Sequence, residues 1–88
     1  MRGKPKKDKI DLGDLEGVIS FHGSHHAIRS EGLLKRHGFT AVLIPGPRAI
    51  SPNCGVAVRF DWRLREEVVS LLRENLVHFE DVHYYPEQ

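Results

Sequence analysis

The chain is predicted to fold as an α+β domain, because short strand-like runs alternate with amphipathic segments in the order β-α-β-β-α-β. Its 88 residues suffice for one modest hydrophobic core. Hydrophobic residues make up 40% of the chain and charged residues 28%, which is typical of a globular protein. Glycine, proline or a capping residue bounds each run, so the element order can be followed along the chain.

The first half of the chain predicts a strand, a helix and a second strand. Residues 18–21 form a short β-branched run that follows a glycine. Ser24 is expected to cap a helix over residues 25–37, and Gly38 is expected to end it in a left-handed turn. Residues 39–44 are almost continuously apolar, which is typical of a buried strand.

The second half repeats the alternation after a proline-rich segment at residues 45–53. Residues 55–60 predict a third strand, Asp61 can cap a helix over residues 63–75, and residues 77–85 predict the last strand. The apolar stripe of this helix consists of Leu64, Val68, Leu71 and Leu72. We therefore expect one ferredoxin-like domain over residues 14–88, with a four-stranded antiparallel sheet and two helices on one face.

Residues 1–13 are predicted to be a basic, disordered, solubilising tail. Five of the thirteen basic residues lie within the first nine positions with one acid, so residues 1–9 carry +4, while residues 10–88 hold eight basic against eleven acidic groups. A mildly acidic domain argues against a surface that grips a phosphate backbone. The third strand also lacks the glycine-aromatic signature of RNA-recognition domains, so nucleic acid is not an expected partner.

No membrane or export segment is expected. The longest apolar stretch, residues 41–44, is far too short to cross a bilayer, and no apolar segment follows the basic start. A single cysteine without a secretory signal favours a reducing, cytoplasmic location.

The predicted topology brings distant residues to one rim of the sheet. A right-handed β-α-β crossover makes strands one and two parallel, so the first helix starts at the end where the second strand stops. His22, Ser24, His25 and His26 should therefore share a rim with the proline-rich segment and Cys54.

Cys54 is the only cysteine, so its packing or its reactivity decides its role. Arg48, the helix start and the pair His25 and His26 are sources of positive potential that would favour a thiolate. The alternative is a structural Cys54, buried at the start of the third strand. The domain would then be a small ligand-binding or protein-interaction module.

The chain resembles the selenium/sulfur carrier protein-like family of short, largely uncharacterised bacterial proteins. The residues that carry the resemblance are Ser24-His25-His26-Ala27, Glu31, Leu34, Leu43-Ile44-Pro45, Pro47-Arg48 and Cys54-Gly55. The resemblance implies a carrier, rather than a turnover enzyme, in which Cys54 holds sulfur or selenium as a persulfide or perselenide. Arg48 and His25 would then shape its pocket, donor and acceptor proteins would be its partners, and no cofactor is implied. Gly46 departs from the pattern, which usually has a bulkier residue between the two prolines.

Further alternatives remain open at this point. Glu31 lies between Ala27 and Leu34 on the helical wheel, so it either orients Arg48 or a histidine or is a rim residue whose carboxylate reaches water. A metal site formed by the histidines and Cys54 is a second alternative for the function, although their spacing lacks a ligand motif. Aromatic residues on an open sheet face favour a homodimer through that face. These aromatic residues are Trp62, Tyr84 and Tyr85.

Overall fold

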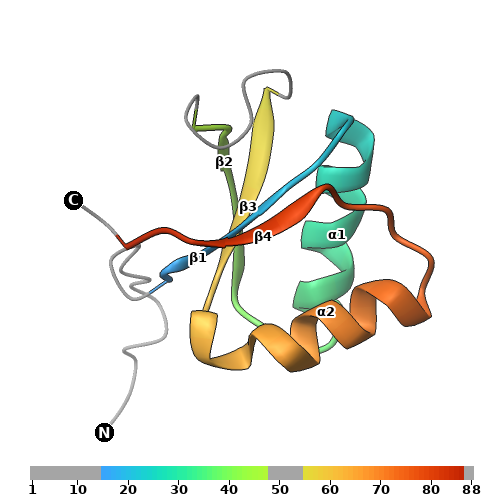
Figure 1. Cartoon of the computed structure of the whole chain (residues 1–88). Helices are drawn as coiled ribbons and strands as arrows, with labels where there is room; N and C mark the ends of the chain where they lie inside the picture. The colour runs from blue at the N-terminus through green and yellow to red at the C-terminus, as the bar shows by residue number, and fades with distance from the viewer. Residues whose placement is uncertain (1–14, 48–54, 87–88) are drawn as a thin grey trace, which may run out of the picture.

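The computed structural model describes residues 15–47 and 55–86. The predicted tail and the segment with Arg48 and Cys54 lie outside these residues. The elements, shown in Figure 1, are β1 (Gly17–Ser20), α1 (Ser24–Arg36), β2 (Ala41–Pro45), β3 (Val56–Phe60), the 3-10 turn η3 (Trp62–Leu64), α2 (Arg65–Glu74) and β4 (Asp81–Tyr84).

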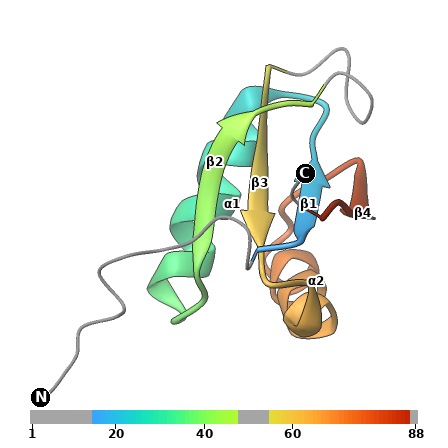
Figure 2. The same cartoon turned by 90° about the vertical axis from the view of Figure 1, so that its left-hand side faces the viewer.

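The four strands form one sheet in the order β2-β3-β1-β4. Each neighbouring pair is antiparallel, so β1 and β2, which flank β3, run parallel to each other. Figure 2 shows the three strands β2, β3 and β1 side by side. The predicted α+β class, the four-stranded antiparallel sheet and the two helices are therefore confirmed.

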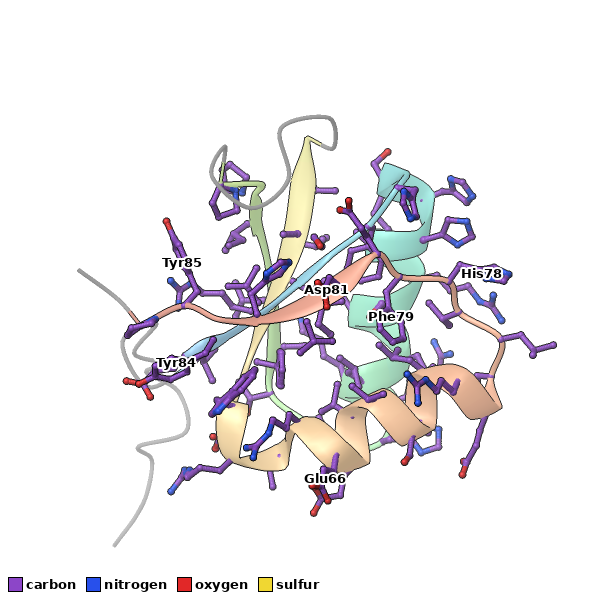
Figure 3. All side chains as sticks on the ribbon, viewed as in Figure 1. Glu66, His78, Phe79, Asp81, Tyr84 and Tyr85 are labelled. Atoms are coloured by element: carbon purple, nitrogen blue, oxygen red, sulfur yellow. The ribbon has the colours of Figure 1, made fainter. Side chains whose placement is uncertain are left out.

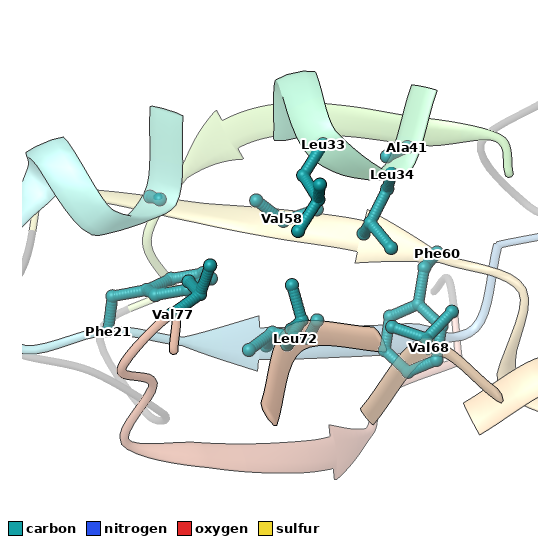
Figure 4. Packing of buried hydrophobic residues seen from close by; sticks show 11 residues of the cluster. Phe21, Leu33, Leu34, Ala41, Val58, Phe60, Val68, Leu72 and Val77 are labelled. Carbon is teal, nitrogen blue, oxygen red and sulfur yellow. The ribbon is translucent and has the colours of Figure 1, made fainter. Parts of the chain in front are cut away.

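Both helices pack on the same face of the sheet. Successive strand residues point to opposite faces, so Val58 and Phe60 of β3 share one face. These side chains belong to one buried cluster with Leu34 of α1 and Leu72 of α2, as Figure 4 shows. Full burial of a Leu or Phe side chain contributes about 1.5–3 kcal/mol, so this layer of contacts holds the helices on the sheet.

The start of α1 differs from the prediction. Gly23 is the N-cap in an extended conformation, Ser24 is the first helical residue, and no side chain within residues 15–47 and 55–86 caps the helix. The Gly23 carbonyl instead accepts a hydrogen bond from the His26 amide at 3.2 Å. The predicted Ser24 cap is thus wrong by one position. Gly38 has a φ of +88°, which confirms the expected glycine stop.

The start of α2 is also more elaborate than predicted. The Asp61 carboxylate accepts a hydrogen bond from the Arg63 amide at 3.0 Å, so it caps η3, and α2 follows from Arg65. The Arg63 side chain donates to the same carboxylate and holds the pKa of Asp61 below its ordinary value. At the other end, Leu76 has a φ of 57°, a conformation usually left to glycine.

The face of the sheet opposite the helices is partly closed. Val18 and Ala57 of the central strands are fully buried, and Arg59 is 4% exposed. The Arg59 guanidinium donates to the Leu15 carbonyl and lies over the Tyr85 ring, 5.6 Å from its centroid. The middle of this face therefore presents little apolar surface.

Neither helix of the described chain combines the length and the apolar run that crossing a membrane requires.

Candidate functional site

The candidate rim is the end of the sheet where β1 and β2 stop and β3 starts. Pro45 of β2 pairs with Val56 of β3, and one step further Ile44, Ala57 and Ser20 lie side by side across the strands. Because α1 begins four residues after Ser20, its N-terminus lies at this same end.

Of the predicted site residues, Gly55 marks where β3 begins. It is exposed, and its carbonyl accepts a hydrogen bond from the Gly46 amide at 3.1 Å. This bond brings together the two ends of the segment between β2 and β3. Arg48 and Cys54 lie in that segment, outside the described residues.

The predicted histidines gather at the start of α1. The rings of His25 and His26 lie 4.0 Å apart between centroids, and the His26 ring contacts the ring of His78 edge-on at 5.6 Å. Figure 3 labels His78, which precedes β4. Ser24 and His25 are exposed, whereas His26 is half-buried. A group of imidazoles at a helix N-terminus thus borders the candidate rim.

The environment of His26 disfavours its protonated form. Desolvation is the main cause of its lowered pKa, and the charges of His25, His78, Arg29 and His22 lower it further. Its Nδ1 atom is buried without a hydrogen-bond partner among the described residues. Protonation of both ring nitrogens would make Nδ1 a buried donor without an acceptor, and a neutral His26 avoids this.

Glu31 has a local partner in the described chain. Its carboxylate lies 2.6 Å from the ammonium of Lys35, one helical turn on, and its side chain is 19% exposed. The ion pair lies on the α1 surface, where such pairs contribute about 0–1 kcal/mol. The geometry supports the rim alternative for Glu31. Its relation to Arg48 stays a prediction.

A metal centre finds no support among the described residues. Within residues 15–47 and 55–86, no three histidine, aspartate or glutamate side chains are grouped so that they could hold a metal ion. A site completed by Cys54 would lie outside this part of the chain.

Comparison with known families shows which family this chain is part of. The family model described as "Putative Se/S carrier protein-like" matches residues 16–84. The chain belongs to this family. The match begins just before β1, ends with β4, and spans Cys54 and the whole candidate rim. No curated protein and no solved structure shows a significant match.

The sequence of this Se/S carrier-like chain did not predict the contact between His78 and His26. His78 was expected within the last strand, but β4 starts only at Asp81. The strand register of the structure, which pairs Ser20 of β1 with Asp81 of β4, explains the contact. In an antiparallel pair, the residues that precede β4 lie beside those that follow β1, which brings His78 to the start of α1.

Proposed function

We propose that this Se/S carrier-like chain holds sulfur or selenium on Cys54 and passes it from a donor protein to an acceptor protein. The observation that carries the proposal is the family match, which spans Cys54, the only cysteine of the sequence.

The transfer balances without an added oxidant when the donor is a persulfide or perselenide. The Cys54 thiolate attacks the terminal sulfur or selenium of the donor, and the donor thiolate leaves with the electron pair. The new bond makes Cys54 a persulfide or perselenide. An acceptor thiolate then attacks the same terminal atom, and the Cys54 thiolate is released.

The rim supports this role in two ways. Cys54 directly precedes Gly55 in the sequence, and Gly55 is exposed at this end of the sheet. The N-terminus of α1 directs its first amide groups and the positive end of its dipole toward the same end of the sheet. A thiolate or persulfide anion is stabilised by such a field. Arg48 and His25 are proposed to add to it.

Other sequence-based expectations remain part of this proposal. The strand order and the two helices on one face support the ferredoxin-like assignment. A cytoplasmic location fits a chain that must keep its only thiol reduced. A homodimer through the open sheet face is less favoured, because Val18 and Ala57 are already buried there.

The test is the intact mass of the protein after incubation with a low-molecular-weight persulfide or perselenide and removal of excess reagent. We expect a gain of one sulfur or selenium atom, which a thiol acceptor removes. Cys54→Ser should show no gain. A wild-type mass that stays unchanged with both donors would contradict the carrier role.

Alkylation kinetics separate a reactive Cys54 from a structural one. At about pH 7, Cys54 should react faster than the cysteine of an unstructured peptide, and Arg48→Ala should slow the reaction more than Arg48→Lys. Slower labelling of the native protein than of the peptide would favour the structural alternative. Bound metal found by elemental analysis of the purified protein would favour the metal alternative.

A further inference from the structure

The exposed side of α2 lies between two grooves. One groove, of about 470 Å³, runs between α2 and β4 and is lined by Trp62, Val69 and Val82. The other, of about 420 Å³, lies on the opposite flank and is lined by Phe39 and Leu71. In Figure 1, α2 forms the lower edge of the molecule.

Two residues of α2 line both grooves and therefore form the crest between them. They are Glu66 and Ser70, both exposed. Figure 3 shows Glu66 pointing away from the body of the protein. The small Ser70 side chain in the middle of the crest would let a second helix approach closely.

The flanks of the crest carry opposite charges. The flank toward β4 has the order positive, apolar, positive, and the flank toward Phe39 has the order negative, apolar, negative. We name them the arginine row, which consists of Arg65, Val69 and Arg73, and the glutamate row, which consists of Glu67, Leu71 and Glu74. The members of each row are three or four positions apart, so each row runs along one side of the helix.

The arginine row is held in place by aromatic rings. The Arg65 guanidinium lies over the Trp62 ring at 4.8 Å from its centroid, and Arg73 lies over Phe79 at 5.9 Å. In the described part of the chain, Glu67 and Glu74 take part in no ion pair. The four charged residues of the two rows are therefore exposed, and they are arranged before any partner arrives.

We propose that the α2 crest is a docking surface for a second copy of this chain, with the two α2 helices side by side and parallel. A two-fold axis along the helices places the arginine row of each copy against the glutamate row of the other on both sides of the contact. Arg73 then faces Glu74 of the second copy at nearly the same height. An antiparallel pair would place like rows together, and like charges oppose association.

The carrier rim stays free in this assembly. α2 starts after the end of β3, whereas the rim lies where β3 begins, so the helix leaves the opposite end of the sheet. The inference therefore goes beyond the carrier proposal and does not depend on Cys54.

The first test is sedimentation of the full chain under reducing conditions over a range of concentrations. We expect a reversible dimer that weakens as salt rises, because exposed ion pairs are screened. Arg73→Glu and Glu74→Arg should each raise the dimer dissociation constant at least about tenfold, since both symmetric contacts become repulsive. A wild-type chain that stays monomeric at about millimolar concentration would overturn the proposal.

Two controls distinguish the charge pairing from local damage. The double variant Arg73→Glu with Glu74→Arg should dimerise like wild type, because the swap restores opposite charges. An equal mixture of the two single variants should form a heterodimer, although neither forms a homodimer. Failure of both rescues would show that the rows do not meet.

A cross-link tests the parallel direction. In a Cys54→Ser background, Glu66→Cys should form a disulfide between the two copies on oxidation, because equal positions face each other. In an antiparallel pair centred on Ser70, the two positions would be about 12 Å apart, too far for a disulfide. Cross-linking only between Glu66→Cys and Glu74→Cys variants would overturn the parallel arrangement.

Discussion

The imidazole of His26 couples the stability of the fold to pH because desolvation lowers its pKa and neighbouring charges lower it further. His25 and His22 lie close to it in sequence, Arg29 lies one turn further along α1, and His78 comes from the segment before β4. The larger cause of the lowered pKa is desolvation, and the Nδ1 atom of the ring is buried. The lowered pKa means that the folded protein binds this proton less readily than the unfolded chain does.

Stability should therefore fall as the pH decreases from about 6.5 toward the lowered pKa of His26, because the unfolded state takes up more protons in that window. Above this pH window, His26 is neutral in the folded and the unfolded state, so it does not make the stability depend on pH. His26→Asn should make the free energy of unfolding less dependent on pH. Urea titrations at about pH 7.5 and pH 5 measure the free energy of unfolding at each pH. An equal difference between the two pH values in the variant and in wild type would contradict the prediction.

Replacement of glycine by alanine should have opposite effects on stability at Gly17 and at Gly32. A Cβ atom at Gly17 would lie 2.5 Å from the ring of Phe60, which is fully buried. Gly17→Ala should destabilise the protein by about 1–3 kcal/mol, because the ring has no space to move into. At Gly32, inside α1, an added Cβ atom would meet only the end of Arg36 among the described residues, at 3.7 Å. Gly32→Ala should stabilise it by about 0.5–1 kcal/mol. Thermal or urea unfolding decides, and equal effects would contradict this account.

The C-terminus of α2 contains a strained residue that the sequence did not indicate. Leu76 adopts a left-handed conformation and is 75% exposed, so its side chain gains little from packing. The equivalent position after α1 is occupied by Gly38. Both helices thus end in the same backbone turn, one of them without the residue that favours it.

Leu76→Gly is expected to stabilise the protein by roughly 0.5–1 kcal/mol. Relief of the left-handed strain, about 1–2 kcal/mol, exceeds the added flexibility of glycine in the unfolded chain. Leu76→Ala is the control, because alanine keeps the strain and should change stability little. Urea unfolding measures both variants. A Leu76→Gly protein less stable than Leu76→Ala would show that the exposed side chain matters more than the backbone.

Element boundaries moved where backbone geometry competed with side-chain signals. Ser24 has a side chain that could cap a helix, yet Gly23 occupies the N-cap position, and its carbonyl accepts a hydrogen bond from the His26 amide in the first turn. Asp61 does cap, but it caps a 3-10 turn before α2. The periodic stripe of α2 was predicted correctly, because Val68 and Leu72 are buried as their spacing requires.

The N-terminal boundary of the domain can be tested on the whole molecule. Leu15 is 5% exposed, and the Glu16 carbonyl accepts a hydrogen bond from the Tyr85 amide at 2.7 Å. These two residues therefore belong to the folded domain. Removal of residues 1–13 should change the free energy of unfolding by less than about 0.5 kcal/mol. Removal of residues 1–16 should cost about 2–5 kcal/mol, since a buried leucine and a sheet hydrogen bond are lost.

Leu15→Ala in the full chain is the matched control, with a loss of about 2–5 kcal/mol expected from the cavity alone. Urea unfolding of the three proteins decides. A large loss already on removal of residues 1–13 would move the domain boundary toward the N-terminus.

The sequence by itself determined the α+β class, the order of the elements, the antiparallel sheet and the candidate thiol. These follow from turn residues and apolar periods that act over a few neighbouring positions. Only the tertiary structure placed His78 against His26, and only it set the two charged rows of α2 beside two grooves. Such contacts depend on strand register, here the pairing of Ser20 with Asp81, and no local pattern encodes a pairing across that separation.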